Sequence, residues 1–230
     1  MLLPLLLGCS VHTLTTVEAT LPADDLTALR FDVAAGDAYF AADPGTNQIY
    51  AQVTVGAMTG PGGDGCPVLD ALVFVLEERD GEAVLTVDFE GPNHHGGWAD
   101  VTVYAPPHLL LTGEDGSGDL SIQGFDDVDV VDGSGDTWIH QIGNNVVVND
   151  TSGDLLIEAV DGSVTVTDTS GDIRVYGVEG DVDIDDESGD IKVEAVGGVV
   201  TVRDGSGDIR ISGAADVEVL EDGSGDVRID

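Results

Sequence analysis

Apolar and polar residues alternate along most of this chain, in short runs that turn residues separate. After Asp172, the apolar residues Ile173 and Val175 alternate with other side chains, and Val182 and Ile184 repeat the pattern after a turn. Alternation with a period of two indicates a strand with one buried face. Glycine, aspartate and serine between the runs are typical of turns. No window has the apolar stripe of a helix, so the pattern predicts an all-β chain.

A five-residue motif, Asp-x-Ser-Gly-Asp, punctuates the alternation and occurs seven times. The first step between copies is 17 residues and the next five steps are 18. Repetition at a short fixed period is typical of a solenoid. The copies begin and end, in chain order, at Asp115 and Asp119, Asp132 and Asp136, Asp150 and Asp154, Asp168 and Asp172, Asp186 and Asp190, Asp204 and Asp208, and Asp222 and Asp226.

The same slots after each motif hold mostly apolar residues. One position past the last aspartate come Leu120, Thr137, Leu155, Ile173, Ile191, Ile209 and Val227. One 18-residue unit cannot bury such a face alone, but stacked units bury a continuous core. Successive coils would then pair as parallel strands about 4.8 Å apart. We therefore predict a single-chain parallel β-solenoid (β-helix) with about 18 residues per coil and two short strands per coil.

The first eight residues, MLLPLLLG, are too few to span a bilayer as a helix. They look like the end of a secretory signal peptide. With Cys9 they resemble the bacterial lipoprotein signal, in which the cysteine becomes the acylated N-terminus. The resemblance implies a signal peptide at 1–8, lipidation at Cys9, secretion through the general export pathway and a membrane partner reached through the lipid anchor. The alternative is a frayed apolar N-terminus.

The rest of the chain divides into segments according to how regular the repeat is. Residues 9–25 are polar and short of structure signals, and we interpret them as a tether. Residues 26–230 form the predicted β-solenoid, with irregular early coils at 26–112 and regular repeats at 113–230. A separate small β domain at 26–112 is the alternative, but no linker marks a boundary near residue 112.

The chain is strongly acidic, with 45 acids, seven bases and a net charge of −38. Nucleic acids and anionic lipid surfaces need cationic patches, so the charge argues against both as partners. Four of the bases, Arg174, Lys192, Arg210 and Arg228, follow successive motifs at the same spacing. They predict an outward-facing basic ladder that neighbours such as Glu158 and Glu194 offset.

The fourteen motif aspartates are predicted to form two columns along one edge of the solenoid. Like charges at this spacing repel each other by roughly 1 kcal/mol in water, so the columns need a stabilising partner. One explanation is turn chemistry, in which Asp and Ser side chains hydrogen-bond to backbone and Gly takes the left-handed conformation. The other is a bound calcium ion, which prefers oxygen ligands. Calcium is the one cofactor that the sequence suggests, with all fourteen aspartates as candidate ligands.

The repeated Ser-Gly-Asp-(Leu/Ile)-x-(Ile/Val) units, together with the strand and prolines that lead into the first repeat at 101–119, resemble a bacterial family known as putative adhesins. These are β-solenoid domains of otherwise unknown function. The resemblance covers most of residues 26–230. It implies a surface-anchored, non-enzymatic protein and brings no catalytic residues with it.

These observations predict a non-enzymatic cell-envelope lipoprotein, a rod that acts as a structural or adhesin-type interaction protein. Its location would be the outer membrane or cell surface, and its partner a protein or a glycan. The alternative function is a calcium-binding module. An enzyme is disfavoured because the short turns after residue 115 leave no walled pocket. The last repeat holds one strand, so we also expect weak end-to-end self-association or a partner that covers this end.

Overall fold

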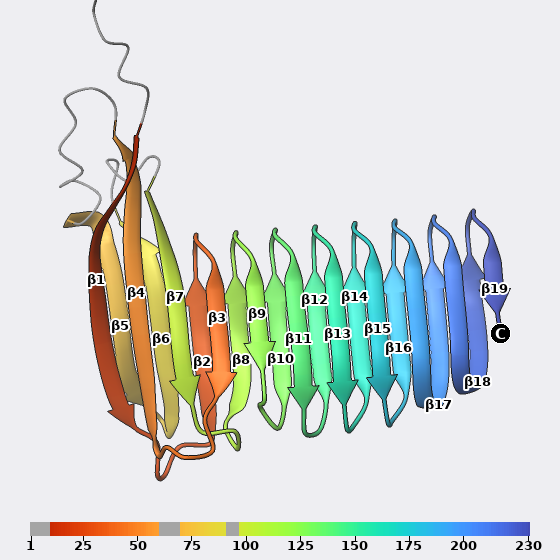
Figure 1. Ribbon diagram of the computed structural model, residues 1–230, viewed down its shortest axis with the longest axis horizontal. Coiled ribbons are helices and arrows are strands. Elements are labelled where there is room, and N and C mark those ends of the chain that lie inside the picture. The colour runs from red at the N-terminus through yellow and green to blue at the C-terminus, as the bar shows by residue number, and fades with distance from the viewer. Residues whose placement is uncertain (1–9, 60–69, 91–96) are drawn as a thin grey trace, which may run out of the picture.

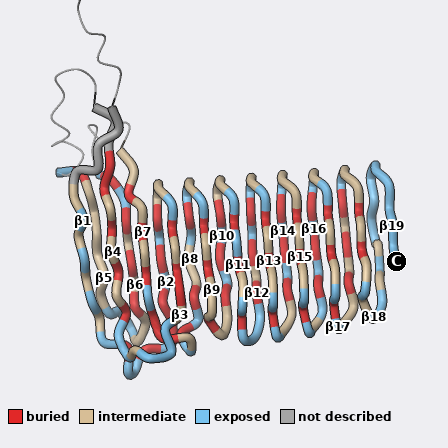
Figure 2. The backbone as a smooth tube through the Cα atoms, viewed as in Figure 1, coloured by how far each residue is buried: buried red, intermediate tan, exposed pale blue. Residues whose placement is uncertain are grey.

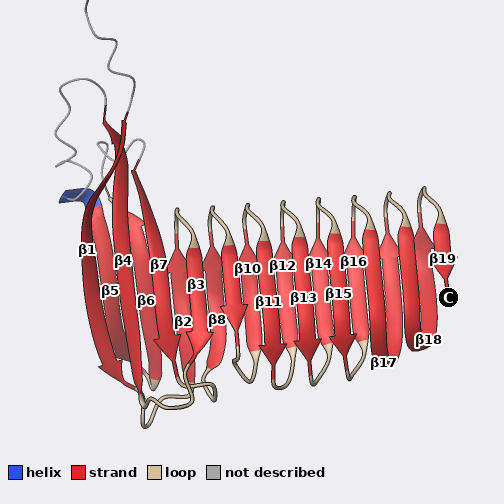
Figure 3. Cartoon of the chain, in the orientation of Figure 1, coloured by secondary structure: helices blue, strands red, loops and turns tan. Residues whose placement is uncertain are grey.

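The computed structural model describes residues 10–59, 70–90 and 97–230, with the side chains of 10–14 and 57–59 left out. These residues form nineteen strands and almost no helix (Figure 3). The strands lie side by side along one elongated body, with turns at both edges (Figure 1). The sequence prediction of an all-β parallel solenoid is confirmed.

Strand pairing divides the body into two stacks. The first stack contains, in spatial order, β5 (Leu72–Arg79), β6 (Glu82–Phe89), β2 (Ala28–Val33), β8 (Leu110–Asp115), β10 (Val128–Asp132), β12 (Val146–Asp150), β14 (Val164–Asp168) and β16 (Val182–Asp186). The second stack contains β1 (Ser10–Pro22), β4 (Gln48–Thr59), β7 (Gly97–Ala105), β3 (Ala38–Ala42), β9 (Leu120–Gln123), β11 (Thr137–Ile142), β13 (Leu155–Val160) and β15 (Ile173–Val178).

The last three strands continue both stacks. β17 (Ile191–Asp204) and β18 (Ile209–Asp222) each bend, so that their first halves extend the second stack and their second halves extend the first. β19 (Val227–Ile229) pairs with the first half of β18. Equivalent positions of successive repeats lie side by side: Ile173 pairs with Ile191, and Ile191 pairs with Ile209. This register is the one that the repeat predicts.

The N-terminal part of the solenoid is not stacked in chain order. The β2–β3 coil lies between the β6–β7 coil and the β8–β9 coil, although it precedes both in sequence (Figure 1). Three of the strand pairings here are antiparallel, since β4 pairs with both β1 and β7 and β5 pairs with β6. The sequence predicted irregular early coils at 26–112 and did not specify the direction of their strands.

Residues 10–22, predicted as part of a tether, instead form β1. Its partner β4 spans twelve residues, and β1 pairs with it along almost its whole length. Val17, Ala19 and Leu21 alternate with exposed residues and turn a half-buried side toward the core. The segment is rich in threonine, so its apolar alternation is weak. For that reason the sequence predicted a tether here.

A single apolar core runs between the two stacks. Buried aliphatic residues alternate with outward ones along each strand (Figure 2). In the regular coils these are the predicted ladders, for example Val130, Val148, Val166, Ile184 and Val202. Phe31 and Phe40 fill the core of the β2–β3 coil, with ring centroids 4.4 Å apart. Among the described residues, no helix is long and apolar enough to cross a membrane.

Candidate functional site

Each motif forms the corner where the chain passes from the first stack to the second. Its glycine has a positive φ in every copy, from 126° at Gly118 to 153° at Gly207. This is the left-handed region that favours glycine. The corners also approach closely, since a Cβ on Gly153 would lie 1.7 Å from the carbonyl oxygen of Gly135. Glycine is therefore required twice, for its backbone conformation and for the contact between coils.

The first aspartate of each of the first six motifs is buried in the solenoid, whereas Asp222, in the last coil, is exposed. We call this row the inner column, and six of its members are at most 4% exposed: Asp115, Asp132, Asp150, Asp168, Asp186 and Asp204. In five corners Oδ1 accepts the backbone N–H of the motif serine, for example Ser152 to Asp150 at 3.0 Å. Turn chemistry therefore accounts for one oxygen of each of these five carboxyl groups.

The second oxygen of the inner column is mostly without a donor. Within the described residues, Oδ2 of Asp115, Asp150, Asp168, Asp186 and Asp204 is buried and unpaired. Asp132 differs because Thr137 donates its hydroxyl to Oδ2 over 2.7 Å. Burial, followed by the charge of neighbouring aspartates, raises the pKa of Asp115 and Asp150 to about 7. The pKa of Asp186 is also raised to about 7, and those of Asp132, Asp168 and Asp204 are raised too, in each case chiefly by burial.

The last aspartate of each motif points outward and forms the outer column. Oδ1 of every member except Asp226, in the last coil, accepts the backbone N–H of the corresponding aspartate in the next coil, at 2.9–3.2 Å. The ladder continues into the N-terminal coils, where Oδ1 of Asp37 accepts the N–H of Asp119 and the N–H of Asp37 donates to Oδ1 of Asp100. The outer column thus joins coil to coil, which is the turn chemistry that the sequence suggested.

The two columns divide the fourteen candidate calcium ligands between two environments. Six inner aspartates are buried in the core, and six outer aspartates accept backbone N–H groups of the next coil. Among the described residues, no group of three or more His, Cys, Asp or Glu side chains is arranged to hold a metal ion. Calcium binding therefore stays a prediction from the sequence, and the hydrogen bonds of the corners explain the conserved spacing of the motif without it.

The basic ladder lies where the sequence placed it. Arg174, Lys192, Arg210 and Arg228 stand side by side on the outward face of the second stack. Their partners are mainly outer-column aspartates: Arg174 contacts Asp172 at 2.8 Å and Asp154 at 3.2 Å. Arg210 repeats this arrangement with Asp208 and Asp190, Arg228 contacts Asp226, and Lys192 pairs with Glu194 at 3.1 Å. Glu194 was a predicted partner, whereas Glu158 instead accepts a hydrogen bond from Trp138.

Sequence reasoning missed a second feature of this same outward face. Tyr39, Tyr104 and Trp138 lie on it, and Tyr104 and Trp138 are each 41% exposed. The signal was available, because Trp138 and His140 occupy outward slots two and four positions past the motif. Their rings stack with centroids 4.4 Å apart and planes 5° from parallel.

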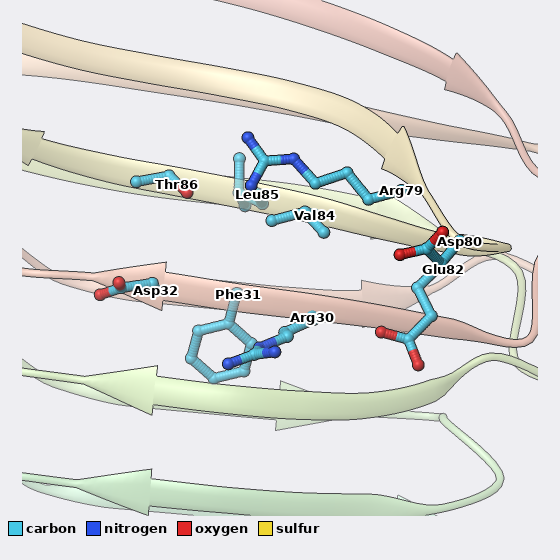
Figure 4. A pocket seen from close by; sticks show the side chains of 9 residues that line it. All are labelled: Arg30, Phe31, Asp32, Arg79, Asp80, Glu82, Val84, Leu85 and Thr86. Atoms are coloured by element: carbon cyan, nitrogen blue, oxygen red, sulfur yellow. The ribbon is translucent and has the colours of Figure 1, made fainter.

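A shallow hollow opens on the outward face of the first stack (Figure 4). Arg30 and Asp32 of β2 line one side, and Arg79, Glu82 and Thr86 of β5 and β6 line the other. Arg79 forms an ion pair with Glu77. The charges are mixed and exposed, and the raised-pKa carboxyls lie inside the core rather than here. The hollow therefore lacks a buried acid or base aimed at a bound molecule.

The remaining candidate, the lipidation residue Cys9 and the signal peptide at 1–8, lies outside the described residues. The described chain begins at Ser10, where β1 starts. The strand lies at the opposite end of the body from β19 (Figure 1).

The fold and its corners define a repeat protein of the β-solenoid class. The chain belongs to the Toastrack DUF4097 family, whose model matches residues 89–230. This places it among the bacterial putative adhesin-type β-solenoid domains of unknown function, as the sequence resemblance implied. No curated protein matches the chain.

Solved structures with a similar fold carry related names. A putative adhesin from Bacteroides fragilis is 12% identical, with a TM-score of 0.48, over 94% of this chain and 97% of that one. A putative lipid binding protein from Parabacteroides distasonis is 13% identical, with a TM-score of 0.47, over 89% and 96%. A putative adhesin from Parabacteroides merdae is 15% identical, with a TM-score of 0.45, over 89% and 96%. None of these names attributes an enzymatic activity to its protein.

Proposed function

We propose that this chain is a non-enzymatic, lipid-anchored rod of the cell envelope that presents its outward strand faces to a surface partner. The observation that carries the proposal is the filled, continuous stack of coils. Two sheet faces and two rows of short corners make up the regular part of the body, so contact with a partner must occur on a long, repetitive surface. Such extended surfaces are what solenoid proteins use for binding.

The position of the perturbed carboxyls supports a binding role over catalysis. General acid–base chemistry needs titratable groups with separated pKa values that a substrate can reach. The inner and outer columns do differ in environment, but the inner carboxyls are enclosed among aliphatic side chains. The mixed charges around Arg30 and Arg79 lie in an open hollow instead. Every described carboxyl group with a raised pKa is buried in this way.

The anchor part of the proposal rests on the lipoprotein-like sequence that ends at Cys9. Acylation there would hold the start of β1 close to the membrane. The regular coils, which begin past β7, would then project away from it. The partner at the outward faces is a protein or a glycan, and self-association at the last coil remains a prediction from the sequence.

The anchor is tested by expressing the full chain in a bacterium fed with labelled palmitate. We expect label in the protein, a mass increase on the N-terminal peptide, and recovery in the membrane fraction. Cys9→Ala should lose all three and leave the circular dichroism spectrum unchanged. Wild-type protein that is unlabelled and soluble, or a Cys9→Ala variant that still fractionates with membranes, would refute the anchored rod.

A further inference from the structure

The chain contains four tyrosines and two tryptophans, and all six lie on one outward face. The face belongs to the second stack, and its six rings come from β3, β4, β7, β11 and β15. We call it the aromatic face, formed by Tyr39, Tyr50, Trp98, Tyr104, Trp138 and Tyr176. The outward face of the first stack has neither residue type. Burial does not explain this segregation, because none of the six side chains is in the buried core.

Four of the six rings form two groups. Tyr104 lies between Tyr39 and Tyr50, with centroid distances of 6.4 Å to each. Two coils further along, Trp138 stacks against His140. Near the N-terminal end, the indole of Trp98 packs directly over Gly56, where any Cβ would clash with the ring. Glycine at this position therefore lets an aromatic ring lie against the sheet.

Polar planar groups connect the rings. Gln123 donates to the hydroxyl of Tyr39 and contacts Nε2 of His140 at 2.7 Å through its carbonyl oxygen. Gln52 donates to the hydroxyl of Tyr50 at 3.0 Å and to Glu18 at 2.9 Å. Each amide keeps acceptor or donor capacity beyond these bonds. The face thus combines apolar ring surfaces with side-chain groups whose directions are fixed by their neighbours.

The charge around the aromatic face restricts what can bind there. The basic ladder overlaps the end of this face, since Arg174 and Tyr176 both lie on β15 and Lys192 Nζ lies 5.2 Å from the ring centroid of Tyr176. The cations of the ladder are also paired with outer-column aspartates or with Glu194. The whole chain carries a net charge of −38. A polyanion would meet repulsion from the acidic body. An uncharged partner would meet no such repulsion, and it could bind without displacing the existing ion pairs.

We propose that the aromatic face binds a neutral polysaccharide. A sugar ring has apolar C–H groups on its faces, which the negative face of an aromatic ring attracts, and hydroxyls around its edge. Those hydroxyls match the amide, imidazole and carboxylate groups between the rings. A glycan chain is also extended and repetitive, like the face. The inference rests on the proposed function, in that an envelope-anchored rod is exposed to such chains.

A protein partner is the competing occupant. The centres of protein interfaces combine aromatic residues with close-packed apolar neighbours. The outward positions between these rings instead include Thr54, Thr102 and Ser121, together with the two glutamines. This polar surrounding favours a hydroxyl-rich ligand, and the protein alternative becomes an outcome of the test.

The test is a glycan array that carries both neutral and acidic polysaccharides, probed with the full chain in mild detergent. We expect retention on neutral glycans alone. Both tryptophans lie on the aromatic face, so soluble oligosaccharides of a retained glycan should shift the intrinsic tryptophan emission. The double variant Tyr104→Ala/Trp138→Ala should bind about tenfold more weakly, because it removes two exposed ring contacts.

The matched control is Leu110→Ala/Val131→Ala, which trims two exposed apolar residues on the first stack and should bind like wild type. Unchanged melting curves confirm that both variants fold. Retention on no neutral glycan, or equal binding by the aromatic variant, would overturn the proposal. So would adhesion to cells that proteinase abolishes and periodate leaves intact, which indicates a protein partner. Because the array needs no anchor, its failure is separable from failure of the Cys9 experiment.

Discussion

Thr137 donates its hydroxyl to Oδ2 of Asp132 over 2.7 Å, inside the core of the solenoid. In five other described corners the same oxygen lacks a donor, because Leu120, Leu155, Ile173, Ile191 or Ile209 fills the slot that Thr137 occupies. Thr137 is the only threonine at this position, and its hydroxyl supplies the donor that Oδ2 of Asp132 would otherwise lack. Burial raises the pKa of the other five carboxyls and so favours their neutral form over a buried charge.

We predict that Thr137→Val, which keeps the shape and removes the hydroxyl, destabilises the protein by about 1–3 kcal/mol at pH 7. The reason is that Asp132 would keep a buried oxygen without its donor. The reverse change is tested at Leu155. Leu155→Thr places a hydroxyl beside Asp150, so this variant should be more stable than its isostere Leu155→Val by about 1 kcal/mol. Urea unfolding of the four proteins measures both differences. Equal stability of the two Leu155 variants would contradict the inferred geometry.

The inner column also predicts how stability depends on pH. Burial raises the pKa of Asp115, Asp150 and Asp186 to about 7, whereas an unfolded aspartate titrates near 3.9. Between about pH 4 and pH 7 the folded chain therefore holds more protons than the unfolded chain. The free energy of unfolding must then fall as the pH rises through this window and level off above it. Most proteins lack such a fall, since paired carboxylates stabilise them as the pH rises.

The variant Asp150→Asn isolates one group of the inner column. Its amide oxygen can still accept the N–H of Ser152, but the side chain no longer titrates. We expect the loss of stability between pH 4 and pH 8 to shrink by on the order of 1 kcal/mol for each pKa unit of the removed shift. The control Asp129→Asn makes the same charge change at an exposed position. A pH profile that Asp150→Asn leaves unchanged would argue against raised titration in the column.

The two-residue alternation of each strand already indicates which aspartates are buried. Asp132 follows Val128 and Val130 at two-residue steps, so it shares their inward side. The repeat alone predicted the coils, their register and the basic ladder, because identical slots must stack. It did not predict that the two aspartates of one motif face opposite sides, since the motif reads as a turn. Following the strand's alternation into the turn would have found the buried row.

The order of the N-terminal coils could not be predicted from the repeat. The β2–β3 corner, residues 33–37, has Val33 in place of the first aspartate and Ala35 in place of the serine. It nevertheless stacks under the first motif, because Val33 pairs with Asp115. A degenerate corner with an apolar inner residue is compatible with the same core, so tertiary packing alone places it. The aromatic face was missed for a related reason: its rings belong to coils that are distant in sequence.

In the outer column, removing the charge of an aspartate should affect stability less than removing its hydrogen-bond acceptor. Oδ1 of Asp172 accepts the N–H of Asp190 at 3.1 Å, and Oδ2 contacts Arg174. Asp172→Asn keeps an oxygen acceptor and should cost little, because exposed ion pairs contribute about 0–1 kcal/mol. Asp172→Ala leaves the amide of Asp190 without its partner and should cost about 1 kcal/mol more. Thermal unfolding compares them, and equal midpoints would mean that the coil-to-coil bond contributes nothing.

Calcium offers a fourth test of the columns. The corner hydrogen bonds account for the aspartates without a metal, so we expect calcium to raise the melting temperature no more than sodium chloride of equal ionic strength. High salt itself should stabilise the protein, since it screens the repulsion of a chain with a net charge of −38. Melting curves in chelator, in millimolar calcium and in matched sodium chloride decide this. A calcium-specific rise would restore the calcium-binding alternative.

The bend five residues past each motif predicts an effect of glycine that depends on its position. Gly177, Ala159 and Ala195 occupy equivalent places in successive coils, and all three have a φ between 57° and 66°. An L-residue in this conformation costs roughly 1–2 kcal/mol, and glycine avoids the cost while losing more chain entropy on folding. We therefore expect Ala159→Gly to be neutral or stabilising by up to about 1 kcal/mol. Glycine substitution inside a strand ordinarily has the opposite sign.

The reciprocal variant completes the argument. A Cβ at Gly177 would have its nearest neighbour at 3.8 Å, so the position has room for a methyl group. Any loss of stability in Gly177→Ala then comes from the backbone conformation and not from a clash, and we expect about 1 kcal/mol. Denaturant unfolding of both variants beside wild type separates the two effects. If Ala159→Gly were as destabilising as Gly177→Ala, the left-handed backbone conformation would not be what sets the stability of this position.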